Sequence, residues 1–225
     1  MSFLSSLVTE VESINKAMRE LNYPCVVAIG ASAGGLAAFQ ELIENLPTDT
    51  GMVFVLLSHI LRGSKSLLPD ILSRSTKMPV IQVTNKEQIL ANHIYILPPD
   101  KFMEIHEDSL LLIPRPDKKV NSAIDHFLFS LAEDQAHGSI GIVLSGEGSD
   151  GSEGLKFLKE EGGTTMAQTP KTAASKSMPI SAIKIDHVDY VLSPKEIAQN
   201  LGSKKWCESH ITKNPLNIFW HKQGP

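Results

Sequence analysis

Short apolar runs alternate with segments of helical spacing from Pro24 onward, and this alternation limits the choice of fold more than any other feature. A strand that is apolar along its whole length can be buried on both faces, which is typical of parallel sheets covered by helices. The pattern therefore predicts an α/β fold, with a doubly wound, mostly parallel sheet and helices on both faces. The predicted strands are 25–29, 52–57, 80–83, 93–97, 139–145, 164–168 and 189–193, and the predicted helices are 36–46, 66–74, 122–136, 152–161 and 194–201.

One segment departs from this alternation. Residues 102–113 alternate in polarity around Glu107-Asp108, which predicts an antiparallel hairpin at the edge of the sheet. Ser122 is the expected N-cap of the helix that follows.

Length, charge and cysteine usage exclude several classes of protein. A chain of 225 residues suits one sizeable domain, and a formal net charge of −4 provides no basic surface for nucleic acid. No apolar run approaches the roughly 18 residues of a membrane span, and the first residues lack the features of a signal peptide, so we expect a cytoplasmic protein without membrane insertion. The two cysteines, Cys25 and Cys207, lack metal-binding spacing and fit a reducing compartment.

The two ends of the chain differ from the middle. Residues 1–23 predict an amphipathic helix, because apolar residues recur every seven positions: Leu4, Val11 and Met18, and Leu7, Ile14 and Leu21. This helix would either pack on its own domain or form a short coiled coil that makes a dimer through residues 4–21. A catalytic or binding domain would occupy residues 24–201. Residues 202–225 lack periodicity and form a C-terminal extension, or mark where a larger chain was cut.

The first polar loop whose residues could take part in catalysis or binding is "GASAGG", residues 30–35. Gly30-x-Ser32-x-Gly34 has the form of a nucleophile elbow, in which small neighbours expose a serine hydroxyl at a strand-to-helix turn. Backbone N–H groups at a helix start suit an oxyanion or a phosphate. The dinucleotide fingerprint and the P-loop lysine are both absent. From this stretch alone, three interpretations of Ser32 stay open: a nucleophile, a phosphate ligand or a turn residue.

Two further loops offer partners for Ser32. His59 directly follows the run 52–57 and is either a general base or a solvent-facing residue. Asp150 follows the run 139–145 and either orients an imidazole or caps the next helix. Because the carboxyl ends of parallel strands share one edge of a sheet, the three residues together predict a Ser-His-Asp triad. Their chain order differs from the Ser…Asp…His order of α/β-hydrolases.

Six ordered motifs resemble the catalytic domain of CheB-type protein-glutamate methylesterases over about residues 24–201. They are "AIGASAGG", "SH" at 58–59, "LPPDKFMEI", "AIDHFLFSLAEDQ", "GIVLSGEGSDGSEGL" and "AQTPKTAASKSMPISAI". The sequences of several of these motifs are similar to those of methylesterase domains fused to CheR-type methyltransferases.

The resemblance implies hydrolysis of γ-glutamyl methyl esters on chemoreceptor cytoplasmic helices or related methylated proteins, and deamidation of some glutamines. It implies no metal or cofactor, and it names a CheR-type methyltransferase as a second partner. The family's triad falls on Ser32, His59 and Asp150. Its oxyanion amides fall near Ala33 and Gly34, and residues at the substrate fall on Glu147 and Met178.

The chain also departs from the family pattern. Ser58 stands where glutamine is usual, and Glu147 stands where methionine is frequent, so a carboxylate at the mouth of the site would disfavour acidic substrate segments. Only 23 residues precede the domain, too few for a phosphoacceptor receiver, so we expect no phosphorylation gating within this chain. Two alternatives remain at this stage: a non-catalytic binding or regulatory module, and a phosphate-ligand-binding α/β domain.

Overall fold

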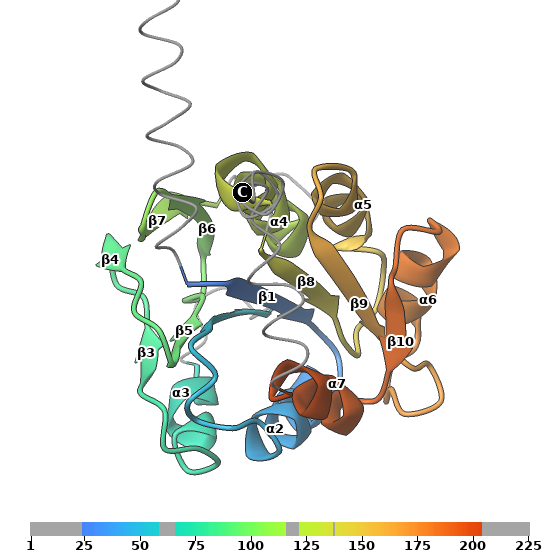
Figure 1. Cartoon of the computed structure of the whole chain (residues 1–225), viewed down its shortest axis with the longest axis horizontal. Helices are drawn as coiled ribbons and strands as arrows, with labels where there is room; N and C mark the ends of the chain where they lie inside the picture. Colours follow the sequence, from blue (N-terminus) through green and yellow to red (C-terminus); the bar gives the residue numbers. More distant parts are fainter. Residues whose placement is uncertain (1–23, 59–65, 116–121, 137, 204–225) are drawn as a thin grey trace, which may run out of the picture.

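The computed structural model describes residues 24–58, 66–115, 122–136 and 138–203. Its centre is a seven-stranded sheet in the order β10-β9-β8-β1-β2-β5-β3, in which every pair of neighbouring strands is parallel (Figure 1). The strands are β1 (Val26–Ala31), β2 (Val53–Ser58), β3 (Val80–Gln82), β5 (His93–Ile96), β8 (Ile140–Val143), β9 (Thr164–Gln168) and β10 (Tyr190–Leu192). The predicted doubly wound α/β fold is confirmed.

Helices cover both faces of this sheet (Figure 1). They are α2 (Gly35–Glu44), α3 (Leu68–Leu72), α4 (Ala123–Gln135), α5 (Ser152–Glu160), α6 (Ser177–Lys184) and α7 (Pro194–Leu201). Side chains from α4, α5 and α6 form one core, and those from α2, α3 and α7 form the other. β1 supplies both, because Val26 and Ala28 belong to the first core and Val27, Ile29 and Ala31 to the second.

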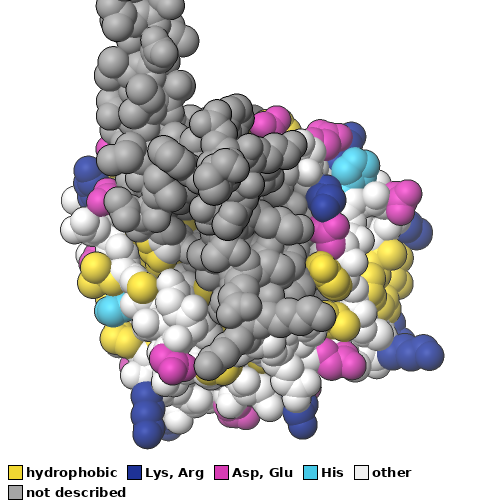
Figure 2. Space-filling view, in the orientation of Figure 1, with side chains coloured by type: hydrophobic (Ala, Val, Ile, Leu, Met, Phe, Trp, Pro, Cys, Tyr) yellow, Lys and Arg dark blue, Asp and Glu magenta, His cyan; other side chains and the backbone are white. Residues whose placement is uncertain are grey.

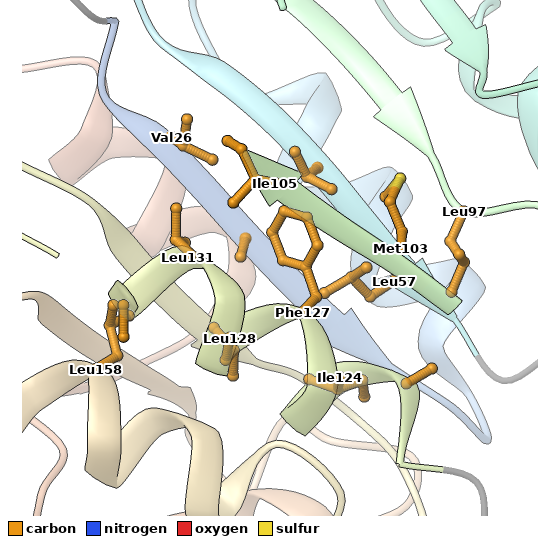
Figure 3. Close-up of a cluster of buried hydrophobic side chains, with 14 of the residues drawn as sticks. Val26, Leu57, Leu97, Met103, Ile105, Ile124, Phe127, Leu128, Leu131 and Leu158 are labelled. Carbon is orange, nitrogen blue, oxygen red and sulfur yellow. The ribbon is translucent and has the colours of Figure 1, made fainter. Parts of the chain in front are cut away.

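The core under α4 explains where that helix lies. Phe127 points from α4 towards β1 and β2, where Met103 and Ile105 of the hairpin belong to the same cluster (Figure 3). Leu128 lies instead against Gly141 of β8 and Gly154 of α5. Gly30 permits this close packing, because a Cβ atom there would lie 2.5 Å from Ile124 Cγ2. The beginning of α4 is thereby fixed against the carboxyl half of β1.

The predicted hairpin is present as β6 (Lys101–His106) and β7 (Ser109–Pro114). It does not extend the large sheet, however. It joins β4 (Glu87–Gln88) in a separate antiparallel sheet of order β4-β7-β6, which packs against α4. Residues 102–113 thus pack on α4 and do not add strands to the edge of the seven-stranded sheet.

Smaller differences from the sequence-based expectations concern short elements. α3 spans five residues where 66–74 was expected, and β4 and α6 have no counterpart among the predicted elements. The N-terminal heptads at 4–21 and the extension from residue 204 lie outside the described residues. The boundaries at 24 and 201 therefore stay predictions. Within the described segments, every helix is too short or too polar to cross a membrane.

Charged side chains of both signs lie on one face of the described residues. On the face seen in Figure 2, Lys and Arg side chains lie interspersed with Asp and Glu side chains around the residues drawn in grey. This view agrees with the weak net charge of the sequence.

Candidate active site

Ser32 lies where the strand order of the sheet reverses. The chain proceeds from β1 to β2 on one side, and β8 occupies the other side of β1. Register pairs Ala31 with Ser58 and Gly30 with Val143, so the carboxyl ends of the three strands lie side by side. Ligands of doubly wound sheets bind at such a switch point.

The turn that carries Ser32 leaves two backbone amides available. The Ser32 N–H donates to the Ser145 carbonyl oxygen at 2.9 Å, and the Gly35 N–H donates to the Ser32 carbonyl oxygen at 2.8 Å. Among the described residues, the N–H groups of Ala33 and Gly34 have no backbone acceptor, and both residues are exposed. Gly34 has φ 74°, and a Cβ there would lie 2.6 Å from Ala174 Cβ, so glycine is required. These are the two amides that the sequence predicts for an oxyanion.

The loop of residues 145–151, called here the aspartate loop, packs directly on this turn. The Ser145 hydroxyl donates to the Ala33 carbonyl oxygen at 2.8 Å and accepts from the Ser175 N–H at 2.9 Å. At Gly146 a Cβ atom would lie 3.0 Å from Ser32 Cβ and 2.0 Å from Met178 Sδ. Only glycine therefore fits between the serine and the start of α6.

Glu147 and Met178, the two predicted substrate residues, have opposite environments. Glu147 is exposed at the tip of the aspartate loop. Met178 is fully buried against Gly146, and its N–H donates to the Gly146 carbonyl oxygen at 2.9 Å. The Met178 side chain thus supports the aspartate loop from behind, and its predicted role at the substrate stays a prediction.

Asp150 is buried and binds the start of a helix, although not the helix that the sequence suggests. Its Oδ2 accepts the Ile124 N–H at 3.1 Å and its Oδ1 accepts the Asp125 N–H at 2.9 Å, both in the first turn of α4. The N-cap residue of the following helix, α5, is Gly151, which has no side chain that could cap it. Ser122 occupies the N-cap position of α4 but makes no capping hydrogen bond with its side chain. Asp150 takes over the role that was expected of Ser122.

Asp125 is a second carboxyl group at this place, which sequence reasoning did not single out. Burial raises its pKa to about 7, and the negative charge of Asp150 and a hydrogen bond between the two carboxyl groups act in the same direction. The Gly154 N–H, which donates to Asp125 Oδ1 at 2.8 Å, opposes this shift. Acidic residues are common in the first turn of a helix, so the sequence gives no sign that Asp125 is unusual. Only the fold shows that it lies beside Asp150.

His59, the predicted base, lies outside the described residues, so its ring is not placed. Ser58 directly precedes it at the end of β2, and the Ser58 hydroxyl oxygen is buried without a hydrogen-bond partner in the described part of the chain. The distance from His59 to Ser32 or Asp150 stays a prediction. Ser32 and Asp150 follow the neighbouring strands β1 and β8, and their joint role stays a prediction.

Comparisons with known proteins identify a family and relatives of this chain. Residues 27–201 match the family model described as CheB methylesterase. A relative from Leptospira interrogans serovar copenhageni, provisionally named a protein-glutamate methylesterase/protein-glutamine glutaminase, is 35% identical over 181 residues, which are 80% of this chain and 93% of the relative.

Two further matches extend the comparison. A protein-glutamate methylesterase/protein-glutamine glutaminase from Carboxydothermus hydrogenoformans is 33% identical over 79% of this chain and 54% of its own length. The crystal structure of the Thermotoga maritima CheB methylesterase catalytic domain superimposes with a TM-score of 0.73 at 27% identity, and the match covers 80% of this chain and 97% of that domain.

Proposed function

The chain belongs to the CheB methylesterase family, whose members are ester hydrolases, and we propose that it removes methyl groups from γ-glutamyl methyl esters through Ser32, His59 and Asp150. The observation that carries the proposal is the packing of Ser32 against the aspartate loop at the switch point of the sheet. Chemoreceptors or related methylated signalling proteins are the proposed substrates. Their cytoplasmic helices would place the reaction in the cytoplasm.

The proposed reaction begins with acyl transfer to Ser32. The Ser32 Oγ attacks the ester carbonyl carbon while His59 accepts the hydroxyl proton. The negative charge then develops on the former carbonyl oxygen, beside the N–H groups of Ala33 and Gly34. These groups suit that charge because the amides of Ser32 and Gly35 are already occupied. Methanol leaves with the proton from His59.

Water completes the cycle. His59 removes a proton from a water molecule, the hydroxide attacks the acyl-enzyme, and Ser32 regains its proton as the glutamate carboxylate is released. A glutamine side chain would follow the same path with ammonia as the leaving group. The second half of the relatives' names, protein-glutamine glutaminase, supports this second activity.

Asp150 is the proposed orienter of His59. Each carboxylate has about four lone-pair sites. The amides of Ile124 and Asp125 take two of them, which fixes the plane of the Asp150 carboxylate at the end of β8. A fixed carboxylate can hold one imidazole tautomer and stabilise the imidazolium that forms.

The partner of this enzyme is a further part of the proposal. A methylated glutamate must be supplied by a methyltransferase, so a CheR-type enzyme is the proposed counterpart, either as a separate chain or fused to this one. The similarity of several motifs to CheR-fused domains supports the fused arrangement. The N-terminal heptads at 4–21 support dimerisation as an additional proposal.

The experiment is methanol release from membranes that carry methylated chemoreceptors. We expect release by the wild type and a loss of at least about a thousandfold in Ser32→Ala and in His59→Ala, because removal of a triad member leaves little beyond binding and oxyanion stabilisation. Ser73→Ala, which removes an exposed hydroxyl at the end of α3, serves as the matched control. Equal release by Ser32→Ala and the wild type would exclude the proposed nucleophile.

A further inference from the structure

Ser145, at the start of the aspartate loop, holds the turn that carries Ser32 at two points. Its carbonyl oxygen accepts the Ser32 N–H at 2.9 Å, and its hydroxyl group donates to the Ala33 carbonyl oxygen at 2.8 Å. The backbone that leads to Ser145 runs beside β1, because the Leu144 N–H donates to the Gly30 carbonyl oxygen at 2.8 Å. One residue thus binds both the proposed nucleophile and the residue that follows it in the chain.

The hydroxyl hydrogen of Ser145 has one favoured acceptor. The side chain is buried, with 1% of the residue exposed, so its partners are protein groups. Its oxygen accepts the Ser175 N–H at 2.9 Å. The single hydrogen can reach the Ala33 carbonyl oxygen at 2.8 Å or the Ser175 carbonyl oxygen at 3.3 Å, and the shorter distance assigns it to Ala33. The bond to Ala33 is therefore the main bond that this hydroxyl group donates.

The backbone of Ser145 is fixed as firmly as its side chain. Its N–H donates to Gln168 Oε1 at 2.8 Å, and Gln168 is buried at the end of β9. Gln168 Nε2 donates in turn to the Thr172 hydroxyl oxygen at 3.2 Å. The N–H, carbonyl and hydroxyl groups of Ser145 are all hydrogen-bonded, so its hydroxyl group is a preorganised donor to the turn.

The turn from Ser32 to Gly35 is a type II β-turn. The Gly35 N–H donates to the Ser32 carbonyl oxygen at 2.8 Å, and Gly34, the third residue of the turn, has φ 74° and ψ 3°. Ala33, the second residue, does not have a positive φ, which excludes the type I′ turn. Because the third residue is glycine, the type I form, with φ of about −90° at that residue, is also accessible.

These two forms of the turn differ in the direction of one peptide group. The Ala33 carbonyl and the Gly34 N–H belong to one planar trans peptide unit, so they point in opposite directions. Passing from type II to type I rotates this unit by roughly 150 to 170°, which exchanges the two directions. Because Ser145 holds the Ala33 carbonyl oxygen, it also fixes the direction of the Gly34 N–H.

We infer that Ser145 is a positioning residue of the proposed active site, whose hydroxyl group selects the type II turn and so directs the Gly34 N–H at the oxyanion. This inference rests on the proposed function, because the oxyanion forms in the proposed reaction of Ser32. In the type I form, the Gly34 N–H would point where the Ala33 carbonyl points now, and the oxyanion would keep only the Ala33 N–H. The energy of one hydrogen bond is enough to shift this balance, since glycine makes both forms accessible.

The first test measures kcat and KM of Ser145→Ala in the methanol-release assay. Loss of a whole oxyanion donor costs about 10²–10³ in kcat, and a turn that populates both forms loses part of this. We expect kcat to fall about fivefold to fiftyfold with little change in KM, because the charge on the oxygen develops only in the transition state. Ser145→Cys, which has a side chain of similar size but a weak donor, should show a smaller fall and replaces the alanine variant if that variant does not fold.

Ser139→Ala is the matched control. Ser139 is also 1% exposed, it precedes β8 where Ser145 follows it, and its hydroxyl group donates to the Ala136 carbonyl oxygen at 2.8 Å. Both alanine variants lose one buried hydroxyl-to-carbonyl bond, so both should lower the free energy of unfolding in urea titrations. Only Ser145→Ala should lose kcat. A fall in kcat that is equal in the two variants, or absent in both, would overturn the inference while the Ser32 chemistry stands.

Nuclear Overhauser effects within the turn give a readout that needs no turnover. In a type II turn the Gly34 N–H lies close to the Ala33 Hα, and in a type I turn it lies farther away, so the cross-peak between these protons reports the form of the turn. We expect a strong cross-peak in the wild type and in Ser139→Ala, and a weaker one in Ser145→Ala. An unchanged cross-peak in Ser145→Ala would overturn the inference, whatever its kcat. If the wild type releases no methanol on any receptor, the proposed function fails, and the cross-peak alone then decides whether Ser145 selects the turn.

Discussion

The two neighbours of Glu147 hold the backbone of the aspartate loop against α6. The Gly146 carbonyl oxygen accepts the Met178 N–H at 2.9 Å, and the Gly148 carbonyl oxygen accepts the hydroxyl groups of Ser177 and Ser181 at 3.1 and 3.3 Å. The backbone on both sides of Glu147 is therefore anchored to α6, while its side chain is exposed. In its predicted place at the substrate, the Glu147 carboxylate would repel acidic substrate segments and attract basic ones.

We predict that Glu147→Gln changes substrate preference more than it changes catalysis. For a methyl-ester peptide with acidic flanks, kcat/KM should rise about twofold to fivefold, since an exposed charge pair is worth up to about 1 kcal/mol. The gain should shrink at 0.5 M salt because screening weakens the repulsion. Glu41→Gln, an exposed carboxylate on α2, should leave the preference unchanged. An equal rise for acidic and basic peptides would contradict a charge-based role.

Single residues of the site differ in how far the sequence predicts them. The glycine pattern around Ser32 is local, so its position at a strand-to-helix turn follows from six consecutive residues. The partners of Asp150 lie 25 and 26 residues earlier in the chain, and no local rule links that loop to the start of α4. The alternative that Asp150 caps the following helix was wrong, because tertiary packing brings its carboxylate to the start of α4 instead.

At the scale of elements, α7 shows how local chemistry can define a helix completely. The Glu196 N–H donates to the Ser193 hydroxyl oxygen at 3.3 Å, and the Ser193 N–H donates to Glu196 Oε2 at 2.8 Å, which completes a capping box. Pro194 follows at the first helical position. Because all three signals are in the sequence, this helix was predicted with the bounds that the structure shows.

We predict that Ser193→Ala lowers the free energy of unfolding by about 1 kcal/mol at neutral pH. The hydrogen bonds from the Ser193 side chain and backbone lower the pKa of Glu196 below its ordinary value of 4.5. Their stabilising effect is thus present above pH 4.5 and is lost as pH falls through the lowered pKa. Urea titrations at pH 7 and pH 3 should show the difference between variant and wild type shrinking at the lower pH. Ser203→Ala is the matched control, and an unchanged difference at pH 3 would argue against the capping box.

The elements that the sequence did not predict owe their stability to other segments. β4 has two residues and exists through its pairing with Leu110 and Ser109 of β7. α6 contains Pro179 near its start, which weakens the helical pattern, and its first turn is fixed by Met178 through Gly146. Neither the cross-strand partner nor the loop contact can be read from residues 87–88 or 177–184 alone.

The molecule as a whole has two cores that share one sheet. Ile43 of α2 belongs to the core on one face, and Ile105 of β6 belongs to the core on the other. Both cores include side chains of β1 and β2, so neither layer can open without exposing the strands that support the opposite layer. The separate hairpin sheet is tied in as well, since Met103 and Ile105 pack in the same cluster as Phe127 (Figure 3).

We therefore predict that the described body of the chain unfolds in one cooperative transition. A destabilising substitution in either core should lower the free energy of unfolding of the whole body. Ile43→Val and Ile105→Val form a matched pair, because both remove one methyl group from a buried isoleucine in opposite cores. Each should cost about 0.5 to 1.5 kcal/mol, and the double variant should cost their sum within about 0.5 kcal/mol. Urea unfolding followed by circular dichroism and by aromatic fluorescence should give coincident curves in all three variants. A hairpin sheet that opened on its own would instead split the transition of Ile105→Val and leave that of Ile43→Val single, which would mean that α4 is held by the large sheet alone.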